Sequence, residues 1–270
     1  MKQFLLVLDN DQPCFNAIEK AVQCTRSADA FLSVIIIVHS LHASAQSYPF
    51  PNDCALTFGD ESNQSLEQVS ADLLAANKKL LADCCRSSNQ PFEIIEQRIG
   101  LSDLIIRTKF MDCLLCEGKI HPGRHHITDL LTHAYCPVYL FGDHPIPARS
   151  VLLAYDGSAA CMGAAASYLQ LFDKDADFVC LHLSTSGQVT PHEKELEDWL
   201  RHHQPGGRLV VDNQEPEAGL LLWLSEHPTD LVVMGSYGRT AVSRFFRHSL
   251  AARLLEQGGT HLFLSHAPSE

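Results

Sequence analysis

Short, continuous apolar runs recur along the chain, and segments with a mixed polar and apolar pattern separate them. The runs cover residues 4–9, 33–39, 111–116 and 138–141 in the first half and 151–156, 178–182, 208–211, 231–234 and 262–264 in the second half. Runs of this length are typical of buried strands, whereas helices are expected at 13–26, 158–172, 216–226 and 249–256. Apolar strands that alternate with helices predict an α/β fold with a parallel sheet covered on both faces.

The pattern of the first half returns in the second half. The run that ends in Asp9 has its counterpart 147 residues later in the run that ends in Asp156, and in each half the next run ends in histidine. With a join near the Pro-containing stretch 142–149, this internal repeat predicts two domains, residues 1–145 and 146–270. Each is expected to be a doubly wound parallel unit of about five strands.

The first half also contains a long polar insertion. Residues 42–65 read HASAQSYPFPNDCALTFGDESNQS. A stretch of this length and composition predicts a mobile loop or lid.

Residue types in the second half indicate where one helix begins. Thr190 has the chemistry of an N-cap, Pro191 suits the first helical position and Glu193 the third, so the sequence predicts a helix that begins at Pro191. The residues of this helix that would face the core are Leu196, Trp199 and Leu200.

Composition and charge narrow the class of protein. With 270 residues, 46% hydrophobic and 19% charged, the chain has enough apolar material for two cores. No run approaches the ~18 apolar residues of a membrane span, and the first residues lack a signal-peptide pattern, so we expect a cytoplasmic protein with no membrane partner. The ten cysteines are then expected to be reduced and mostly buried. A net charge of −12 argues against a nucleic-acid partner.

Residues 231–255 form a basic island in this acidic chain, with four arginines and no acidic residue, and the central loop reads GSYGRTAVSRFFRHS. Gly235 and Gly238 would let backbone amides approach an anion closely, while Arg239 and Ser249 would add a charge and a hydroxyl. A helix expected to begin near Ser249 adds the positive end of its dipole. The loop therefore favours a phosphate group as its ligand.

Asp156 and the junction of Met234 and Gly235 both follow apolar strands. Ligands of open parallel sheets bind beyond the carboxyl ends of the strands, where the winding reverses, so these ends can share one crevice. A carboxylate there accepts hydrogen bonds from the amino or hydroxyl groups of a base or ribose. The alternatives are that Asp156 is a helix N-cap and that the arginines of the loop are simply solvated.

These residues resemble the nucleotide-binding members of the universal stress protein family, in which Gly-x2-Gly-x9-Gly-Ser/Thr follows an apolar strand and Val-Ala-Tyr-Asp-Gly-Ser lies near the start. Residues 154–158 read AYDGS, and Gly235, Gly238 and Ser249 match three of the four loop positions. The resemblance covers nearly the whole chain as a tandem pair. It implies two units of the adenine nucleotide alpha hydrolase-like fold, packed as an intramolecular pseudo-dimer that pairs the last strands of the two halves.

The same resemblance implies an ATP site in the second half, to which ATP can bind with or without Mg²⁺. Asp156 would contact adenine, and the glycines and Ser249 would surround the phosphates. The implied nucleotide-binding residues are Ala154, Asp156, Leu183, Met234, Gly235, Gly238, Arg239, His248, Ser249 and Leu250. His248 stands where the family has its third glycine, so either its backbone N–H serves the phosphates or its ring clashes with them.

The first half departs further from the family pattern. Glu117 replaces the first loop glycine, the loop is shorter, and Arg124 and His125 stand where Gly-Ser is expected. A carboxylate at a strand end repels phosphate, although Asp9 is retained. We therefore expect this half to have lost the nucleotide or to hold a different ligand.

Cys113 and Cys116, followed by His121, His125 and His126, raise the question of a metal site. Residues three apart on a strand point to opposite faces, so buried structural thiols are favoured, with a zinc site at Cys116 and the histidines left open.

Catalytic signatures are missing from the sequence. It has neither a P-loop nor the Ser-Gly-Gly-x-Asp-Ser loop of related adenylyl-transfer enzymes, so we expect no catalytic residue and at most slow ATP hydrolysis.

The leading hypothesis is a stress-response regulator that binds ATP or a related adenine nucleotide in its second half. The competing hypotheses are a nucleotide-free structural or interaction module and a small-molecule or metal sensor that uses the first half. A protein partner and a further homodimer are left open.

Overall fold

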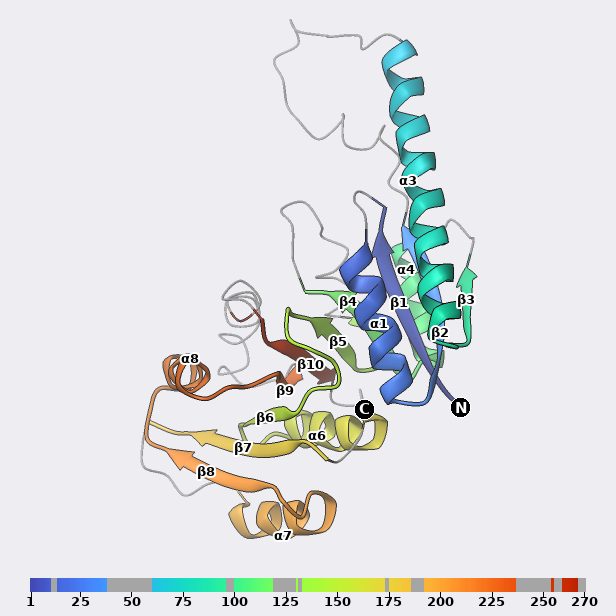
Figure 1. Cartoon of the computed structure of the whole chain (residues 1–270). Helices are drawn as coiled ribbons and strands as arrows, with labels where there is room; N and C mark the ends of the chain where they lie inside the picture. The colour runs from blue at the N-terminus through green and yellow to red at the C-terminus, as the bar shows by residue number, and fades with distance from the viewer. Residues whose placement is uncertain are drawn as a thin grey trace, which may run out of the picture.

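The computed structural model describes residues 1–10, 14–37, 60–95, 100–118, 130, 133–172, 175–185, 192–236, 254 and 259–266. Its strands form one ten-stranded sheet that runs through both halves of the chain (Figure 1). The first half contains β1 (Lys2–Asp9), α1 (Phe15–Ser27), β2 (Ala30–Ile37), α3 (Asp60–Ser87), β3 (Phe92–Ile95), α4 (Leu101–Arg107), the 3₁₀ turn η1 (Thr108–Phe110), β4 (Cys113–Glu117) and β5 (Val138–Phe141). The second half contains β6 (Ser150–Tyr155), α6 (Ala159–Leu171), β7 (Asp177–Leu183), α7 (Glu193–His203), β8 (Arg208–Asp212), α8 (Pro216–Glu226), β9 (Leu231–Ser236) and β10 (His261–His266).

The strand order is β3-β2-β1-β4-β5-β10-β9-β6-β7-β8. Within each half the order is third, second, first, fourth, fifth, and all neighbours are parallel. The winding therefore reverses between β1 and β4 in the first half and between β6 and β9 in the second half. This arrangement confirms the predicted fold class of two doubly wound five-stranded units.

The two halves meet through their last strands, as the sequence resemblance implied. β5 and β10 pair antiparallel, with Tyr139 opposite Phe263 at the centre of the ladder. This pairing makes one sheet from two and covers an edge of each half that would otherwise present unpaired backbone groups. On one face of the seam, Tyr139 and Phe263 pack with Phe172 at the end of α6, and Phe172 also meets Phe4 from the first half.

Two apolar layers cover the sheet, one on each face. One layer joins the strands to α1, α3, α6 and α7, and the other joins them to α4 and α8. Both layers continue from the first half into the second half, so the core is shared. None of the helices described here is both long enough and apolar enough to span a bilayer.

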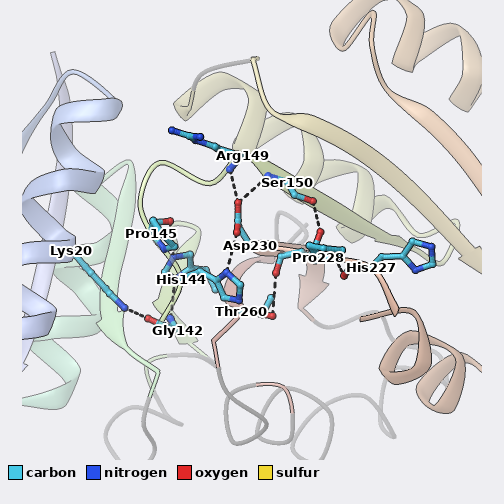
Figure 2. Close-up of polar contacts among 12 residues, drawn as sticks. Lys20, Gly142, His144, Pro145, Arg149, Ser150, His227, Pro228, Asp230 and Thr260 are labelled. Atoms are coloured by element: carbon cyan, nitrogen blue, oxygen red, sulfur yellow. Dashed lines mark hydrogen bonds and ion pairs between the residues drawn. The ribbon is translucent and has the colours of Figure 1, made fainter. Parts of the chain in front are cut away.

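The segment between β5 and β6 is tied to the second half by polar contacts (Figure 2). Lys20 of α1 donates to the carbonyl of Gly142, and the Gly142 N–H donates to Nδ1 of His261 at 2.9 Å. Asp230 accepts from the N–H groups of Arg149 and Ser150 at 2.8 and 3.1 Å. These contacts fix the start of β6 against the start of β9. The predicted domain boundary at 145/146 lies in this segment and stays a prediction.

The nine predicted strands are all present, whereas β3, α4 and the greater part of α3 were not predicted. The prediction that residues 42–65 form a loop was wrong in its last part, because α3 begins at Asp60; residues 38–59 lie outside the described part. Figure 1 shows the amino-terminal turns of α3 projecting beyond the sheet. Residues 60–68 of α3 contain a single apolar residue, Leu66, so the hydrophobic pattern gave no signal there.

The predicted helix start at Pro191 was also wrong. α7 begins two residues later, at Glu193, and its N-cap is His192 in a left-handed conformation with φ 56°. The expected inward residues are correct: Leu196 and Leu200 are buried, and Trp199 packs partly buried against the same core. The carboxylates of Glu193 and Glu195 in the first turn favour this start, because they complement the positive end of the helix dipole.

Candidate functional site

The candidate ligand crevice at the switch point of the second half begins where β6 and β9 separate. Their pairing ends at Leu153 and Val233, whereas β6 stays paired with β7 as far as Tyr155, and β9 stays paired with β10 as far as Ser236. The last residues of β6 and β9 therefore diverge at the carboxyl edge of the sheet. This is the position at which open parallel sheets bind ligands.

Gly235 lies at this split and touches the beginning of α6. A Cβ atom at Gly235 would lie 2.5 Å from the backbone nitrogen of Cys161 and 2.7 Å from the carbonyl carbon of Ala160. Such distances are too short for any side chain, so glycine is what allows β9 to pass the first turn of α6. The sequence assigned Gly235 to an anion; in the structure its described contact is with this helix start.

Asp156 forms the turn between β6 and α6. It is exposed, and its Oδ1 accepts a hydrogen bond from the Ser158 N–H at 2.9 Å, while Gly157 between them has φ 77°. The N-cap of α6 is Ser158, whose hydroxyl accepts from the Cys161 N–H at 3.1 Å. The alternative that Asp156 is the N-cap is therefore wrong, and its carboxylate stands at the solvent edge of the crevice.

Three of the predicted residues form an apolar wall beside Asp156. Ala154, Leu183 and Met234 come from the ends of β6, β7 and β9, and all belong to the apolar layer on the α8 face. α8 lies close to this wall, because a Cβ atom at Gly219 would be 3.1 Å from a methyl group of Leu183. The structure thus brings an exposed carboxylate and an apolar surface to one edge of the sheet.

The cysteine at the start of α6 helps to hold this edge. Its thiol donates to the carbonyl of Ala154 at 3.2 Å, so it links the helix to the end of β6. Burial raises the pKa of the Cys161 thiol, which keeps the proton that this bond requires.

The remaining predicted site residues lie outside the described part of the chain. These are Gly238, Arg239, His248, Ser249 and Leu250. The five residues that the structure does place, from Ala154 to Gly235, converge on the β6 and β9 ends.

One polar pair on the other face was not assigned by the sequence. His182 of β7 is buried, and its Nδ1 lies 3.1 Å from the carbonyl oxygen of Tyr155, to which it donates. Its ring also lies edge-on to Tyr155, with the centroids 6.0 Å apart. Burial raises the pKa of the Tyr155 hydroxyl to about 12. The sequence feature that could have identified this pair is the position of His182 at the end of an apolar strand.

The equivalent edge of the first half is built differently. Cys14 and Cys161 correspond in the internal repeat, but the Cys14 N–H donates to Oδ1 of Asn77 from α3, at 3.1 Å, whereas the Cys161 N–H donates to the hydroxyl of the nearby Ser158. Asn77 also donates to Oδ1 of Asn10, the residue after Asp9, at 3.3 Å. Asn10 in turn donates to the backbone carbonyl of Ser70 at 2.9 Å. In this half, side-chain and backbone groups of α3 form hydrogen bonds with the polar groups that follow β1.

The thiols of β4 behave as the strand geometry predicted. Cys113 belongs to the apolar layer on the α1 face and Cys116 to the layer on the α4 face. Burial raises the pKa of Cys116 to about 12. No group of three or more potential ligands that could hold a metal ion occurs among the described residues. His121, His125 and His126 lie outside them, as do Arg124 and part of the shortened loop.

The expectation that the cysteines are mostly buried is confirmed where the chain is described. All nine cysteines in that part are free thiols, and only Cys84 is partly exposed. The pair His202-His203 lies in the last turn of α7 and is exposed.

The fold and the crevice define a doubly wound α/β protein whose two units join through their last strands. Residues 147–258 match the model of the universal stress protein family. The second half therefore carries a universal stress protein domain, and the strand order gives the first half the same architecture.

Solved structures share this architecture over nearly the whole chain. A universal stress protein from Archaeoglobus fulgidus DSM 4304 is 14% identical and has a TM-score of 0.70, covering 97% of this chain and 96% of its own. A functionally unknown protein from Pseudomonas aeruginosa PAO1 is 11% identical, with a TM-score of 0.55 and coverage of 98% and 92%. The cytoplasmic domain of a prokaryotic cation chloride cotransporter is 12% identical, with a TM-score of 0.55 and coverage of 98% and 94%. At these identities the likeness is one of fold. No curated protein matches the chain.

Proposed function

We propose that this universal-stress-type protein binds ATP or a related adenine nucleotide in its second half and acts as a nucleotide-dependent regulator in the stress response. The observation that carries the proposal is the separation of β6 from β9 beside the exposed carboxylate of Asp156. The family match over residues 147–258 supports the same half.

In this proposal the base lies against the apolar wall of Ala154, Leu183 and Met234. The Asp156 carboxylate accepts a hydrogen bond from the exocyclic amino group or a ribose hydroxyl, since a carboxylate is an acceptor only. One of its oxygens already accepts from the Ser158 N–H, which fixes the orientation of the carboxylate before a ligand arrives. The phosphates are assigned to the loop that contains Gly238, Arg239, His248, Ser249 and Leu250, with Mg²⁺ as their counter-ion.

The test is calorimetric titration of nucleotide-stripped, full-length protein with ATP and magnesium. Loss of a hydrogen bond to a charged group costs about 1.5–3 kcal/mol, so Asp156→Ala is expected to weaken binding by about ten- to a hundredfold. The matched control is Asp9→Ala, the corresponding substitution in the first half, which should leave binding unchanged.

Two outcomes would count against the proposal. If Asp9→Ala abolishes binding and Asp156→Ala does not, the nucleotide occupies the first half. If the wild type does not bind but His248→Gly does, the crevice exists and the histidine closes it, which favours the nucleotide-free interaction module.

A further inference from the structure

β8 is an outer strand of the sheet. In the order of described strands, it has β7 on one side and no strand on the other. It contains five residues, Arg208-Leu-Val-Val-Asp212, with no proline or glycine, and a large apolar side chain, Val211, is 50% exposed. Outer strands with free backbone groups are templates for another strand, and proteins often block them with lysine, proline or a bulge. β8 has none of these devices.

The hydrogen bonds to β7 show which backbone groups of β8 face outward. The Ser184 N–H donates to the Asp212 carbonyl at 3.2 Å, in a parallel ladder where Leu183 is opposite Asp212. The backbone N–H and C=O groups of successive residues point to alternate sides of a strand, so those of Arg208, Val210 and Asp212 point toward β7. The N–H and C=O groups of Leu209 and Val211 therefore point away from the sheet.

We propose that a second copy of the chain pairs with this edge, β8 against β8, antiparallel about a two-fold axis at Val210. This register places Leu209 opposite Val211 of the second copy, so the outward backbone groups of each copy bond to those of the other. The two-fold axis at Val210 relates the pair of Leu209 and Val211 to an identical pair on its other side. The same hydrogen bonds therefore form twice, as an isologous interface requires.

The charges at the ends of β8 select this register. With Val210 at the axis, Arg208 of each copy lies opposite Asp212 of the other, in a non-hydrogen-bonded pair where side chains approach most closely. Opposite charges facing each other across antiparallel strands are stabilising. The Asp212 carboxylate accepts from the Asn213 N–H at 2.7 Å and from the Gln214 amide at 2.9 Å, and two oxygens leave room for a further guanidinium donor.

The side chains on the α7 face fit the same arrangement. Leu209 already packs against the core beneath α7, and its new neighbour would be the half-exposed Val211 of the other copy. The axis also places the two α7 helices antiparallel on one face of the joined sheet. α7 has acidic residues in its first turn and basic residues in its last turn, so unlike ends would lie side by side.

The experiment is light scattering of the full chain after size exclusion, over a wide range of protein concentration. We expect a dimer that dissociates on dilution. Val211→Lys places a charge on the edge without changing a buried site, and it should raise the dissociation constant about tenfold or more. The matched control is Val69→Lys, because Val69 is also an exposed valine, at 63%, but lies on α3; this variant should dimerise like the wild type.

A charge exchange tests the register. Arg208→Asp and Asp212→Arg each place like charges opposite one another and should weaken the dimer, whereas the double variant restores opposite charges and should recover it. Circular dichroism of each variant separates loss of dimer from loss of fold. A wild type that is monomeric at every concentration overturns the proposal. So does a dimer that Val211→Lys leaves intact, or a double variant that stays as weak as the single ones.

Discussion

Asp230 Oδ1 lies 3.0 Å from Nδ1 of His144, and the other oxygen of the same carboxylate accepts from two backbone N–H groups (Figure 2). One side chain at the start of β9 thus holds both the segment between the halves and the first residues of β6. The equivalent position in the first half, Asp112, accepts from a single backbone N–H, that of Gln3, at 2.7 Å. The repeated aspartate has acquired a second role where the halves join.

Asp230→Ala is expected to destabilise the protein more than Asp112→Ala. The first variant loses three hydrogen bonds of a partly buried carboxylate, which should cost about 2–3 kcal/mol, and the second loses one exposed bond, which should cost about 1 kcal/mol. Urea unfolding followed by circular dichroism measures both. Equal losses would show that the contacts of Asp230 with Arg149 and His144 contribute nothing to stability.

Gly142→Ala should be one of the most damaging small substitutions in the chain. Its Cβ would lie 2.4 Å from the backbone carbonyl oxygens of Gly259 and Thr260, and backbone cannot move aside as a flexible side chain can. Overpacking of this kind costs about 1–3 kcal/mol or more. The thermal unfolding midpoint reports the effect.

The matched control is Gly163→Ala in the middle of α6, where a Cβ meets nothing within 4 Å. Alanine is favoured over glycine in a helix by about 0.5–1 kcal/mol, so this variant should be more stable than the wild type. If Gly142→Ala also raised the midpoint, the close approach of the 142–149 segment to β10 would be incorrect.

The sequence predicted most of the strands, because a buried parallel strand needs an uninterrupted apolar run and the repeat supplied four of these runs in both halves. The pairing of β5 with β10 followed from the family resemblance. The first turns of α3 were not predicted, because residues 60–68 contain only one apolar residue and so show no apolar stripe. The start of α7 was misplaced because a left-handed histidine precedes it, and the residue types of Thr190 and Pro191 favoured an earlier cap.

The candidate site was predictable where it depends on strand ends. Asp156 and Met234 were found because each closes an apolar run. The contact between Gly235 and the start of α6 was not predictable, since it joins residues about 75 positions apart in the chain. The same holds for Asn77, which accepts a hydrogen bond from Cys14, the N-cap residue of α1, more than 60 residues earlier.

Asn77→Ala tests whether the first half depends on this long-range hydrogen bond. Asn77 is 1% exposed, and its removal leaves the Cys14 N–H without the acceptor that the structure gives it. A buried donor without a partner costs about 1–3 kcal/mol, so we expect a loss in that range in chemical denaturation.

Ser158→Ala removes the corresponding cap of α6 in the second half and serves as the comparison. It should cost about 1 kcal/mol, since Ser158 is partly exposed and water can replace its hydroxyl. Hydrogen exchange should show faster exchange of α1 in the first variant and of α6 in the second. A reversal of this pattern would contradict the assignment of these two hydrogen bonds to α1 and α6.

His261 makes the stability of the protein depend on pH. It is fully buried; its Nδ1 accepts from the Gly142 N–H at 2.9 Å, and its Nε2 faces the Pro145 carbonyl at 3.4 Å, so the ring is neutral with the proton on Nε2. Burial, with a contribution from Lys20, lowers its pKa from 6.5 to about 4. Between pH 6.5 and about pH 4, His261 is therefore protonated in the unfolded chain but neutral in the folded chain. Stability should fall as pH drops through this window, by about 3 kcal/mol in all.

His261→Gln isolates this effect, because glutamine offers an acceptor and a donor but does not titrate. The unfolding free energy of the wild type minus that of the variant should decrease from pH 6.5 to pH 4 and stay constant above pH 7. Other histidines and the carboxylates cancel in this difference. Nuclear magnetic resonance of the His261 ring gives its pKa directly in the wild type, should the variant fold poorly. A ring that titrates near 6.5, or a difference that does not change with pH, would show that burial at the β5 and β10 seam leaves the histidine free to charge.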